Sequence, residues 1–471
     1  MSKKKITDFI PRKTKQGLIN LNIRLSAFLI LNSRIFRDIF IKRTIKKFQP
    51  NKKCLVNVEN PFWTIGSFWD SDGRFQWLEC ICERKNVNII HLPRDLYRNV
   101  FTHLFYFQGY EANADKGEIP LNVFYDKKFI RQRAKYLFYC NEVAKSIANQ
   151  YKVDIFLIFK LNDDWIIDVL RGIRSSKFPL VVHDREHGIT PKRMKIYPPF
   201  IKDIVNDLKV DKICTSNKTH YDFFLKCGFD RDNLALTGKP DSDAWFIDKK
   251  ITKKAVNHKF NNQVPLITFF SFGQFNYLNF FYKSEKRNWL NLADDFHNVL
   301  IEVLRKLKGR VQIAYKLGGK SIRDYYPGFD KFFKKVIDLN YQDSIVFLDG
   351  NTPTIDLLKV SDCILGFHTL GIIEGMFTDK PICYGAWGDL FDDIKDTLIP
   401  FHKMKGIDVC DNPDQLRDCL IKNILNPVKV TYQREERDKN IEEFLYKADG
   451  QSSERLFNVI NQVYRNFYKE N

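Results

Sequence analysis

Several signals that would place the chain in a specialised class are missing from its 471 residues. The most apolar stretch, residues 18–40, is interrupted by arginines and by Asn32, and so falls well short of the roughly 20 apolar residues that cross a bilayer. We therefore expect neither a transmembrane span nor a cleavable signal. No short-period repeat or low-complexity tract occurs, which argues against solenoid and fibrous proteins.

Cysteine pairs of the zinc-binding kind are also missing. The ten cysteines are scattered, and their one close pair, Cys80 and Cys82, lacks the two-residue gap and the second pair of a typical zinc site. We expect the thiols to be reduced and, with no secretory signal, the protein to be cytoplasmic.

What the sequence does contain is typical of a large folded body. Apolar residues make up 44% of the chain, with 41 Phe and 20 Tyr, which excludes a wholly disordered chain. Its length exceeds what one hydrophobic core usually organises, so we expect two domains.

Positive charge is concentrated at the N-terminus. Residues 1–53 hold fifteen Lys or Arg against two Asp, a net +13 out of the chain's total of +19. Apolar residues from Leu18 to Phe40 recur there at helical spacing, which predicts an amphipathic helix in a basic extension over residues 1–52. Such a helix can lie on an anionic membrane surface, bind another polyanion, pack on the body, or remain a solvated tail.

From residue 54 onward, short apolar runs alternate with longer helical patterns, as in βαβ units with a parallel sheet. Strands are predicted in the first half at 54–58, 87–91, 154–159, 179–183, 212–215 and 234–237, and in the second half at 265–270, 310–315, 344–348, 362–366, 381–384 and 406–409.

A polar, aperiodic stretch over residues 241–263 separates the two series and marks a hinge. The predicted fold class is α/β, with two Rossmann-like, doubly wound domains over residues 53–245 and 262–430. A C-terminal helix over residues 431–471 is long enough to reach back across the hinge.

In open parallel sheets, ligands collect beyond the carboxyl ends of the strands, where loop amides and helix N-termini converge. In the first half, the strand ending at Val182 leads into Asp184, Glu186, His187 and Gly188. Any of the three ionisable side chains can serve as a general base on an acceptor hydroxyl, and Gly188 lets the backbone approach a ligand. The alternative is a solvated turn with a structural glycine.

In the second half, the strand ending at Leu365 is followed by His368 and Thr369 at the start of a helix, where backbone N–H groups favour a phosphate. Glu374, one turn further on, can reach a ribose or sugar hydroxyl. The alternative is that His368 and Thr369 cap the helix and that Glu374 is structural.

Two more strand ends are expected to point towards the same site. Ser271, Gly273 and Gln274 form a small turn suited to close phosphate approach. Lys316, followed by Gly318, can neutralise a diphosphate as a point charge, although an isolated lysine is more often a surface residue.

Over residues 180–390 the arrangement resembles GT-B-type glycosyltransferases of bacterial surface and capsular polysaccharide synthesis, and the related nucleotide-sugar 2-epimerases. The segments that carry the resemblance are Asp211 to Ser216, Gly228-Phe229, Thr237 to Asp243 with its Thr-Gly-x-Pro turn, Leu357 to Asp362, and Glu374-Gly375 ahead of Lys380-Pro381. Departures include His368 in place of a common Ser, Gly375 in place of Ala, and no His-Pro near Lys316.

The resemblance implies a glycosyltransferase that moves a sugar from a nucleotide-activated donor to a surface polysaccharide or lipid-linked glycan. It implies a donor held by the second half, an acceptor near the loops of Gly188 and Lys239, a base at Glu186 or His187, and no required cofactor or metal. The sequence Asp-x-Asp occurs at Asp70 and at Asp241, but neither follows a convincing strand on the donor side.

Two alternatives remain open: a nucleotide-sugar 2-epimerase, hydrolysing or not, and a non-catalytic polyanion-binding protein. No nucleic-acid partner is expected, and the basic extension allows a peripheral position on the inner face of the cell membrane. All of this requires that the loops after Val182 and after Leu365 face each other across one crevice.

Overall fold

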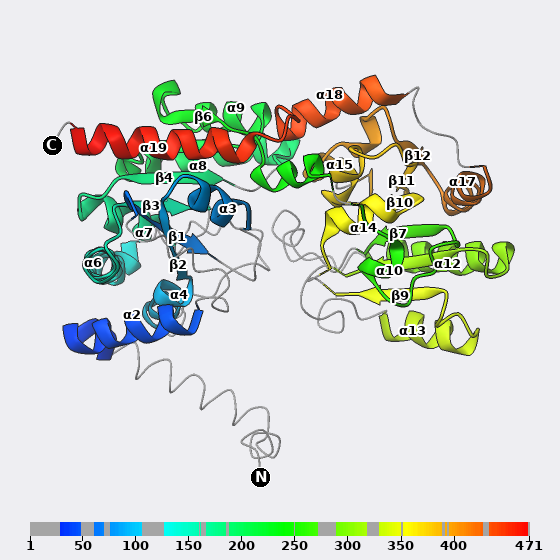
Figure 1. Ribbon diagram of the computed structural model, residues 1–471, viewed down its shortest axis with the longest axis horizontal. Helices are drawn as coiled ribbons and strands as arrows, with labels where there is room; N and C mark the ends of the chain where they lie inside the picture. The colour runs from blue at the N-terminus through cyan, green and yellow to red at the C-terminus, as the bar shows by residue number, and fades with distance from the viewer. Residues whose placement is uncertain are drawn as a thin grey trace, which may run out of the picture.

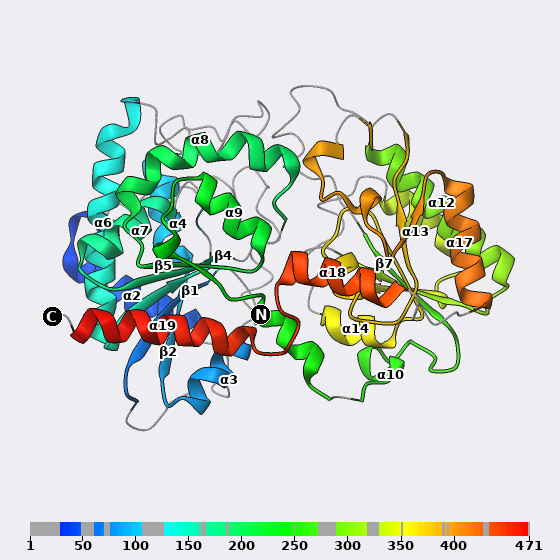
Figure 2. The ribbon, with the colours of Figure 1, turned by 90° about the horizontal axis from the view of Figure 1, so that it is seen from above.

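The computed structural model describes residues 29–48, 61–69, 76–105, 127–159, 161, 166–184, 188–248, 250–271, 289–317, 329–349, 352–388, 391–392, 395–426 and 433–469. These residues form two lobes that lie side by side, each built on one six-stranded sheet (Figures 1 and 2). Every strand pair in both sheets is parallel. The predicted fold class, two Rossmann-like doubly wound halves, is therefore confirmed.

The first lobe has the strand order β2-β1-β3-β4-β5-β6. Its elements are α2 (Arg34–Phe48), β1 (Thr64–Trp69), α3 (Gln76–Arg84), β2 (Asn88–Pro93), α4 (Asp95–Leu104), η4 (Lys127–Phe129), α6 (Ile130–Tyr151), β3 (Ile155–Ile158), α7 (Ile166–Ser175), β4 (Leu180–Asp184), α8 (Pro191–Leu208), β5 (Lys212–Thr215), α9 (Lys218–Lys226), η5 (Arg231–Asn233) and β6 (Leu234–Leu236). The chain then runs through η6 (Pro240–Phe246) and α10 (Lys253–Val256) to the second lobe.

The second lobe has the strand order β12-β11-β10-β7-β8-β9. Its elements are β7 (Leu266–Phe270), α12 (Trp289–Leu307), β8 (Gln312–Lys316), α13 (Phe329–Asp338), β9 (Ile345–Leu348), α14 (Thr354–Val360), β10 (Cys363–Gly366), α15 (Gly371–Gly375), β11 (Ile382–Gly385), η7 (Lys395–Thr397), η8 (Phe401–Lys403), β12 (Asp408–Cys410) and α17 (Pro413–Leu425), followed by α18 (Arg434–Leu445) and α19 (Ser452–Lys469).

The predicted strands match the observed ones except at the start. Strand β1 was not predicted, because Gly66 and Ser67 interrupt its apolar pattern. Gly66 is required by packing, since a Cβ there would lie 2.8 Å from a methyl carbon of Val153. The strand predicted at residues 54–58 lies outside the described residues.

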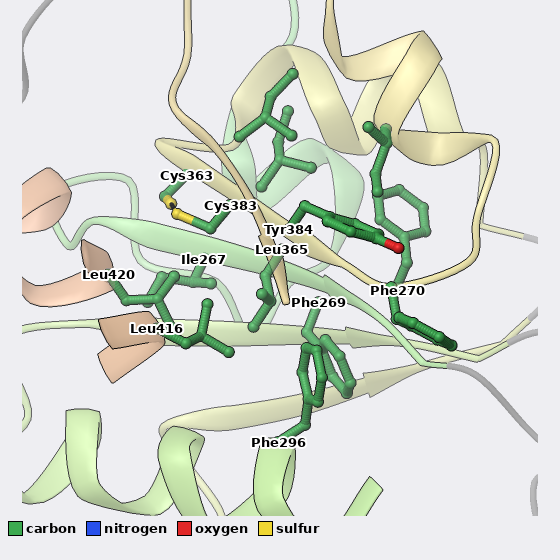
Figure 3. Packing of buried hydrophobic residues seen from close by; sticks show 14 of the residues in the cluster. Ile267, Phe269, Phe270, Phe296, Cys363, Leu365, Cys383, Tyr384, Leu416 and Leu420 are labelled. Carbon is green, nitrogen blue, oxygen red and sulfur yellow. Dashed lines mark hydrogen bonds between the residues drawn. The ribbon is translucent and has the colours of Figure 1, made fainter. Parts of the chain in front are cut away.

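Both faces of each sheet are covered, as alternate side chains show. In β7, Ile267 and Phe269 pack towards α12 and α17, whereas Leu266 packs on the opposite face with Leu357 of α14. Figure 3 shows Ile267 and Phe269 packed beside Phe296, Leu416 and Leu420. Because neither face is left open, function must reside at the strand ends and in the loops.

The C-terminal segment is two helices rather than the single one predicted. The break falls at Tyr446 and Gly450, both with positive φ, +64° and +71°. Helix α18 joins the core of the second lobe through Ile441 and Phe444, and α19 packs Leu456, Phe457 and Ile460 on the first (Figure 2). The tail therefore crosses from one lobe back to the other.

Two polar anchors, the buried Arg437 and the partly buried Asp243, hold these helices. The Arg437 guanidinium donates from Nε and Nη1 to the carbonyl oxygens of Gly406 and Thr378, both at 2.8 Å. The Asp243 carboxylate accepts from the backbone N–H groups that open α19, at 2.9 and 2.7 Å. An acidic side chain at a helix N-terminus is favourable to the helix dipole.

Helix α2 packs on the first lobe, but with a different face from the one that the apolar spacing suggests. Ile41 and Ile45 are buried, and Arg37 is buried beside Glu142, with the charged atoms 3.5 Å apart. Ile35, Phe36 and Ile39 remain exposed, at 72%, 49% and 46%. Across the described residues, no helix combines the length and apolarity needed to span a bilayer.

Buried histidines should make the fold sensitive to acid. His297 is stacked on Phe332 with ring centroids 3.9 Å apart and bonded to the Tyr315 hydroxyl at 2.8 Å, and burial lowers its pKa to about 3. Between that value and its ordinary pKa of about 6.5, only the unfolded chain binds the proton, so stability should fall as pH drops, by up to about 1.4 kcal/mol per pH unit.

We predict that urea unfolding between pH 7 and pH 4.5 shows a shallower pH dependence in His297→Gln than in the unmodified chain. The exposed His258 provides the matched control, and His258→Gln should keep the full slope. Equal slopes in His297→Gln and the unmodified chain would contradict the prediction.

Candidate functional site

The site begins at the point in the second sheet where the strand order reverses. From β7 the chain continues to β8 and β9 on one side, and β10 follows on the other. Such switch points are where open α/β sheets bind ligands, beyond the carboxyl ends of the strands. Here the register aligns Phe270 with Lys316 and with Gly366, so three predicted loops start in one row.

Ser271 and Lys316 are joined within this row. The Ser271 hydroxyl and backbone N–H both donate to the Lys316 carbonyl oxygen, at 2.9 and 3.0 Å. Lys316 is 6% exposed as a residue, and its ammonium donates to the Asp349 carbonyl oxygen just beyond the end of the neighbouring strand. Lys316 is therefore a buried cation at the strand ends, not a surface lysine. Gly273, Gln274 and Gly318 lie outside the described residues.

His368 and Thr369 stand at the turn between β10 and α15, as predicted. The Thr369 hydroxyl accepts from the Gly371 backbone N–H at 3.1 Å, which orders the turn. Burial lowers the pKa of His368 to about 4, so the imidazole is neutral at physiological pH. A neutral ring offers one N–H donor and one acceptor nitrogen.

Gly371 brings this turn close to β7. A Cβ at Gly371 would lie 2.7–2.9 Å from ring carbons of Phe270, so only glycine allows α15 to approach the strand. The close approach sets His368 and Ser271 at the ends of adjacent strands.

One ion pair crosses between the lobes and joins two predicted site residues. The Lys239 ammonium, in the turn after β6, bonds to the Glu374 carboxylate on α15, and the two side chains are only 8% and 18% exposed. Nearby, Trp245 of η6 stacks on Phe377 with ring centroids 5.2 Å apart. The turn after β6 is thus fixed against α15, the helix that follows His368 and Thr369.

The loop after β4 also reaches the second lobe. A Cβ on Gly188 would lie 3.0 Å from the Ile399 side chain, and α8, which follows, packs against η7. Loops from both halves therefore meet along the boundary between the lobes. Glu186 and His187, the base candidates in this loop, lie outside the described residues.

Asp184 is placed differently from a surface base. Its side chain is 1% exposed and its carboxylate lies 3.5 Å from Nε2 of the equally buried His220. The Ser216 hydroxyl donates to its backbone carbonyl oxygen at 3.4 Å. Asp184 therefore anchors the end of β4 within the first lobe.

Sequence reasoning missed most of the contacts that join the lobes. Asn217, which donates to the Phe444 carbonyl oxygen of α18 at 2.9 Å, and Trp245 gave no catalytic pattern that could mark them. Metal-ligating side chains gather once among the described residues, at Cys383 on β11, Asp408 on β12 and Cys419 on α17.

The ion pair of Lys239 with Glu374 should contribute more to the free energy of unfolding than a surface ion pair does. Lys239→Met leaves a largely buried carboxylate without its partner, and we expect a loss of about 2–4 kcal/mol in the free energy of unfolding. Glu374→Gln should lose a similar amount, and the double variant less than the sum, as measured by denaturant titration in a double-mutant cycle.

The exposed pair Lys218 and Asp222, with side chains 73% and 42% exposed, is the control. Lys218→Met should cost less than about 1 kcal/mol. Strictly additive effects of Lys239→Met and Glu374→Gln would show that the pair is not coupled.

Neither a protein-family model nor a curated protein sequence matches the chain. Among solved structures, a UDP-N-acetylglucosamine 2-epimerase aligns over 88% of this chain and 98% of its own, with a TM-score of 0.51 and 11% identity. A UDP-GlcNAc 2-epimerase from Neisseria meningitidis bound to UDP-GlcNAc covers 85% and 100% (TM-score 0.49, 11% identity), and a glycosyltransferase from Rickettsia africae covers 87% and 100% (TM-score 0.45, 14% identity). At such low sequence identities, structural similarity supports only the fold. The chain has the two-lobed GT-B fold.

Proposed function

We propose that the protein is a glycosyltransferase that moves a sugar from a nucleotide-activated donor to a surface polysaccharide or lipid-linked glycan. The observation that carries the proposal is the single row formed by the ends of β8, β7 and β10, with Lys316, Ser271 and His368 at or just beyond it. Because this row lies at the switch point, it is the place where the fold favours a nucleotide.

In this proposal the donor diphosphate sits over the turns after β7 and β10. Ser271, Thr369 and the neutral ring of His368 supply hydrogen bonds, and Lys316 supplies positive charge behind them. Gly273, Gln274 and Gly318, which lie outside the described residues, are further candidates for this role. Charge that develops on the leaving diphosphate is stabilised by these groups, so the transfer needs neither a metal nor a cofactor.

The acceptor approaches from the first lobe, along the loops of Gly188 and Lys239. Glu186 or His187 removes the proton from the acceptor hydroxyl, and the buried Asp184 holds the end of β4, the strand that precedes them. Glu374 is held by Lys239, so its role is to align the two lobes and to present its remaining carboxylate oxygen towards a donor hydroxyl.

A nucleotide-sugar 2-epimerase is the second candidate. The specific support for it is the aligned structure with a TM-score of 0.51, which is described as a UDP-N-acetylglucosamine 2-epimerase. The two candidates differ in one requirement, since an epimerase converts the free donor and a transferase needs an acceptor.

The decisive assay incubates the purified chain with a panel of nucleotide sugars, with and without a glycan or lipid-linked acceptor extract and without added divalent metal. We expect nucleoside diphosphate to be released at least tenfold faster with acceptor than without. Conversion of the free donor sugar in the absence of acceptor, followed by NMR, would instead identify the epimerase. If no donor is bound by the folded chain, both assignments fail and the polyanion-binding alternative gains support.

Variants then separate the base from the donor site. Glu186→Gln or His187→Ala should lower kcat by about 10²–10⁴-fold while leaving donor binding within a few-fold. His368→Ala should weaken donor binding, whereas the exposed His258→Ala serves as the matched control.

A lipid-linked acceptor would fit a peripheral position on the membrane, and α2 provides a surface for it. Ile35, Phe36 and Ile39 form an exposed apolar group, and Lys42 and Arg43 further along the helix are exposed as well. Apolar side chains beside cations suit the interface of an anionic bilayer. We therefore propose that the enzyme works on surface or capsular glycans from the inner face of the membrane.

Vesicle sedimentation tests this placement. The chain should bind vesicles that contain anionic lipid, less at high salt, and the double variant Ile35→Ser, Ile39→Ser should reduce binding at least about threefold. Ile337, 46% exposed on α13, gives the control variant Ile337→Ser, which should bind normally. Equal binding by all three proteins would rule out α2 as the contact.

A further inference from the structure

Four cysteines from four different elements come together in the second lobe. They come from three adjacent strands, β10, β11 and β12, and from helix α17, which covers them; they are Cys363, Cys383, Cys410 and Cys419. The Cys383 sulfur lies 3.8 Å from that of Cys363 and 3.4 Å from that of Cys419. Figure 3 shows the first two thiols turned towards each other.

The side chains of Asp408 and Asn423 complete the cluster. Asp408 Oδ2 lies 3.7 Å from the Cys419 sulfur. The terminal amide of Asn423 approaches three groups at once: Asp408 Oδ2 at 3.1 Å, the Cys419 sulfur at 3.4 Å and the Cys383 sulfur at 3.5 Å. Four side-chain ends therefore surround one point.

The four ends outline an irregular tetrahedron. Five of its six edges are the distances just given, from 3.1 to 3.7 Å, and the sixth, between Cys383 Sγ and a carboxylate oxygen of Asp408, is within 4.8 Å. A four-coordinate metal with bonds of about 2.3 Å to sulfur and about 2.1 Å to oxygen holds its ligand atoms about 3.4–3.8 Å apart.

We propose that Cys383, Cys419, Asp408 and Asn423 bind a divalent metal of the zinc type in tetrahedral geometry. Two thiolates select a borderline-soft ion such as Zn²⁺ over Mg²⁺ or Ca²⁺, which prefer all-oxygen sites. The Asn423 amide turns its oxygen to the ion, since amide O and N positions are assigned from hydrogen bonding and exchange by a flip. Because the metal binds thiolates, any proton still held by a ligand thiol is released on binding.

The proposed metal site is partly open to solvent on one side and buried on the other. Cys419, Asp408 and Asn423 are partly exposed and give access, whereas Cys383 is fully buried. Cys363 and Cys410 adjoin the site: Cys363 contacts the Cys383 thiol, and Cys410 interacts with that of Cys419. They surround the ligands without belonging to the tetrahedron.

In the strand register, Cys383 aligns with Leu365 and with Asp408, one residue before the row that contains Gly366. The proposed metal site is separate because it lies beside α17 on β11 and β12, whereas the turns proposed to hold the donor follow β7, β8 and β10. Its role is to fix α17 to the edge of the sheet. This inference is independent of the proposed transferase activity, because no ligand belongs to the proposed nucleotide site.

Metal binding is tested on the full chain under reducing, anaerobic conditions by titration with Co²⁺. We expect one Co²⁺ per chain, with the visible bands of tetrahedral cobalt and the near-ultraviolet thiolate band, and displacement by one equivalent of Zn²⁺. Zn²⁺ should also raise Tm. A folded chain, checked by circular dichroism, that gives neither band and no change in Tm overturns the proposal.

Variants assign the ligands. Cys419→Ser, Asp408→Asn and Asn423→Ala should each weaken Co²⁺ binding at least about tenfold, while the buried Cys227→Ser of the first lobe and the exposed Cys80→Ser should bind normally. Unchanged binding in Cys419→Ser overturns the site. Loss of binding in Cys410→Ser with full binding in Asn423→Ala overturns the assignment of the fourth ligand.

Discussion

The direction of the strands is the constraint on which the rest of the structure depends. Parallel neighbours require a crossover connection between strands, so helices cover both faces of each sheet and the carboxyl ends collect at one edge. Side chains such as Ile267 and Leu266 alternate between the two faces and are both fully buried. With the faces committed to packing, polar groups such as Ser271 and His368 are concentrated at one rim of the second sheet.

The same constraint explains why so much could be predicted from the sequence. Buried parallel strands are short apolar runs, and the runs at Lys212–Thr215 and Leu266–Phe270 stand out against their polar flanks. Residues directly after such runs are at the rim by necessity, which is why the position of Ser271 and His368 at the rim could be predicted. Strand β1 was missed because a glycine demanded by packing and a serine broke its pattern.

What could not be predicted is how distant parts of the chain meet. Lys239 and Glu374 are 135 positions apart, and neither residue type at either position signals a partner across the boundary. Asp184 reads as a base in sequence, but the approach of His220 from α9 makes it a buried anchor. The cysteines of the second lobe have no motif spacing, because three strands and a helix bring them together rather than a loop.

The C-terminal segment, α18 and α19, restricts how the two lobes can move relative to each other. The chain passes between the lobes once through η6 and again between α18 and α19, and these passages touch: a Cβ on Gly450 would lie 3.0 Å from Phe246, and one on Gly238 would lie 2.6 Å from the Ser452 hydroxyl. Any swing of one lobe relative to the other must bend two contacting segments together. The two segments connect the lobes independently, so a proteolytic cut in either one leaves the lobes joined by the other.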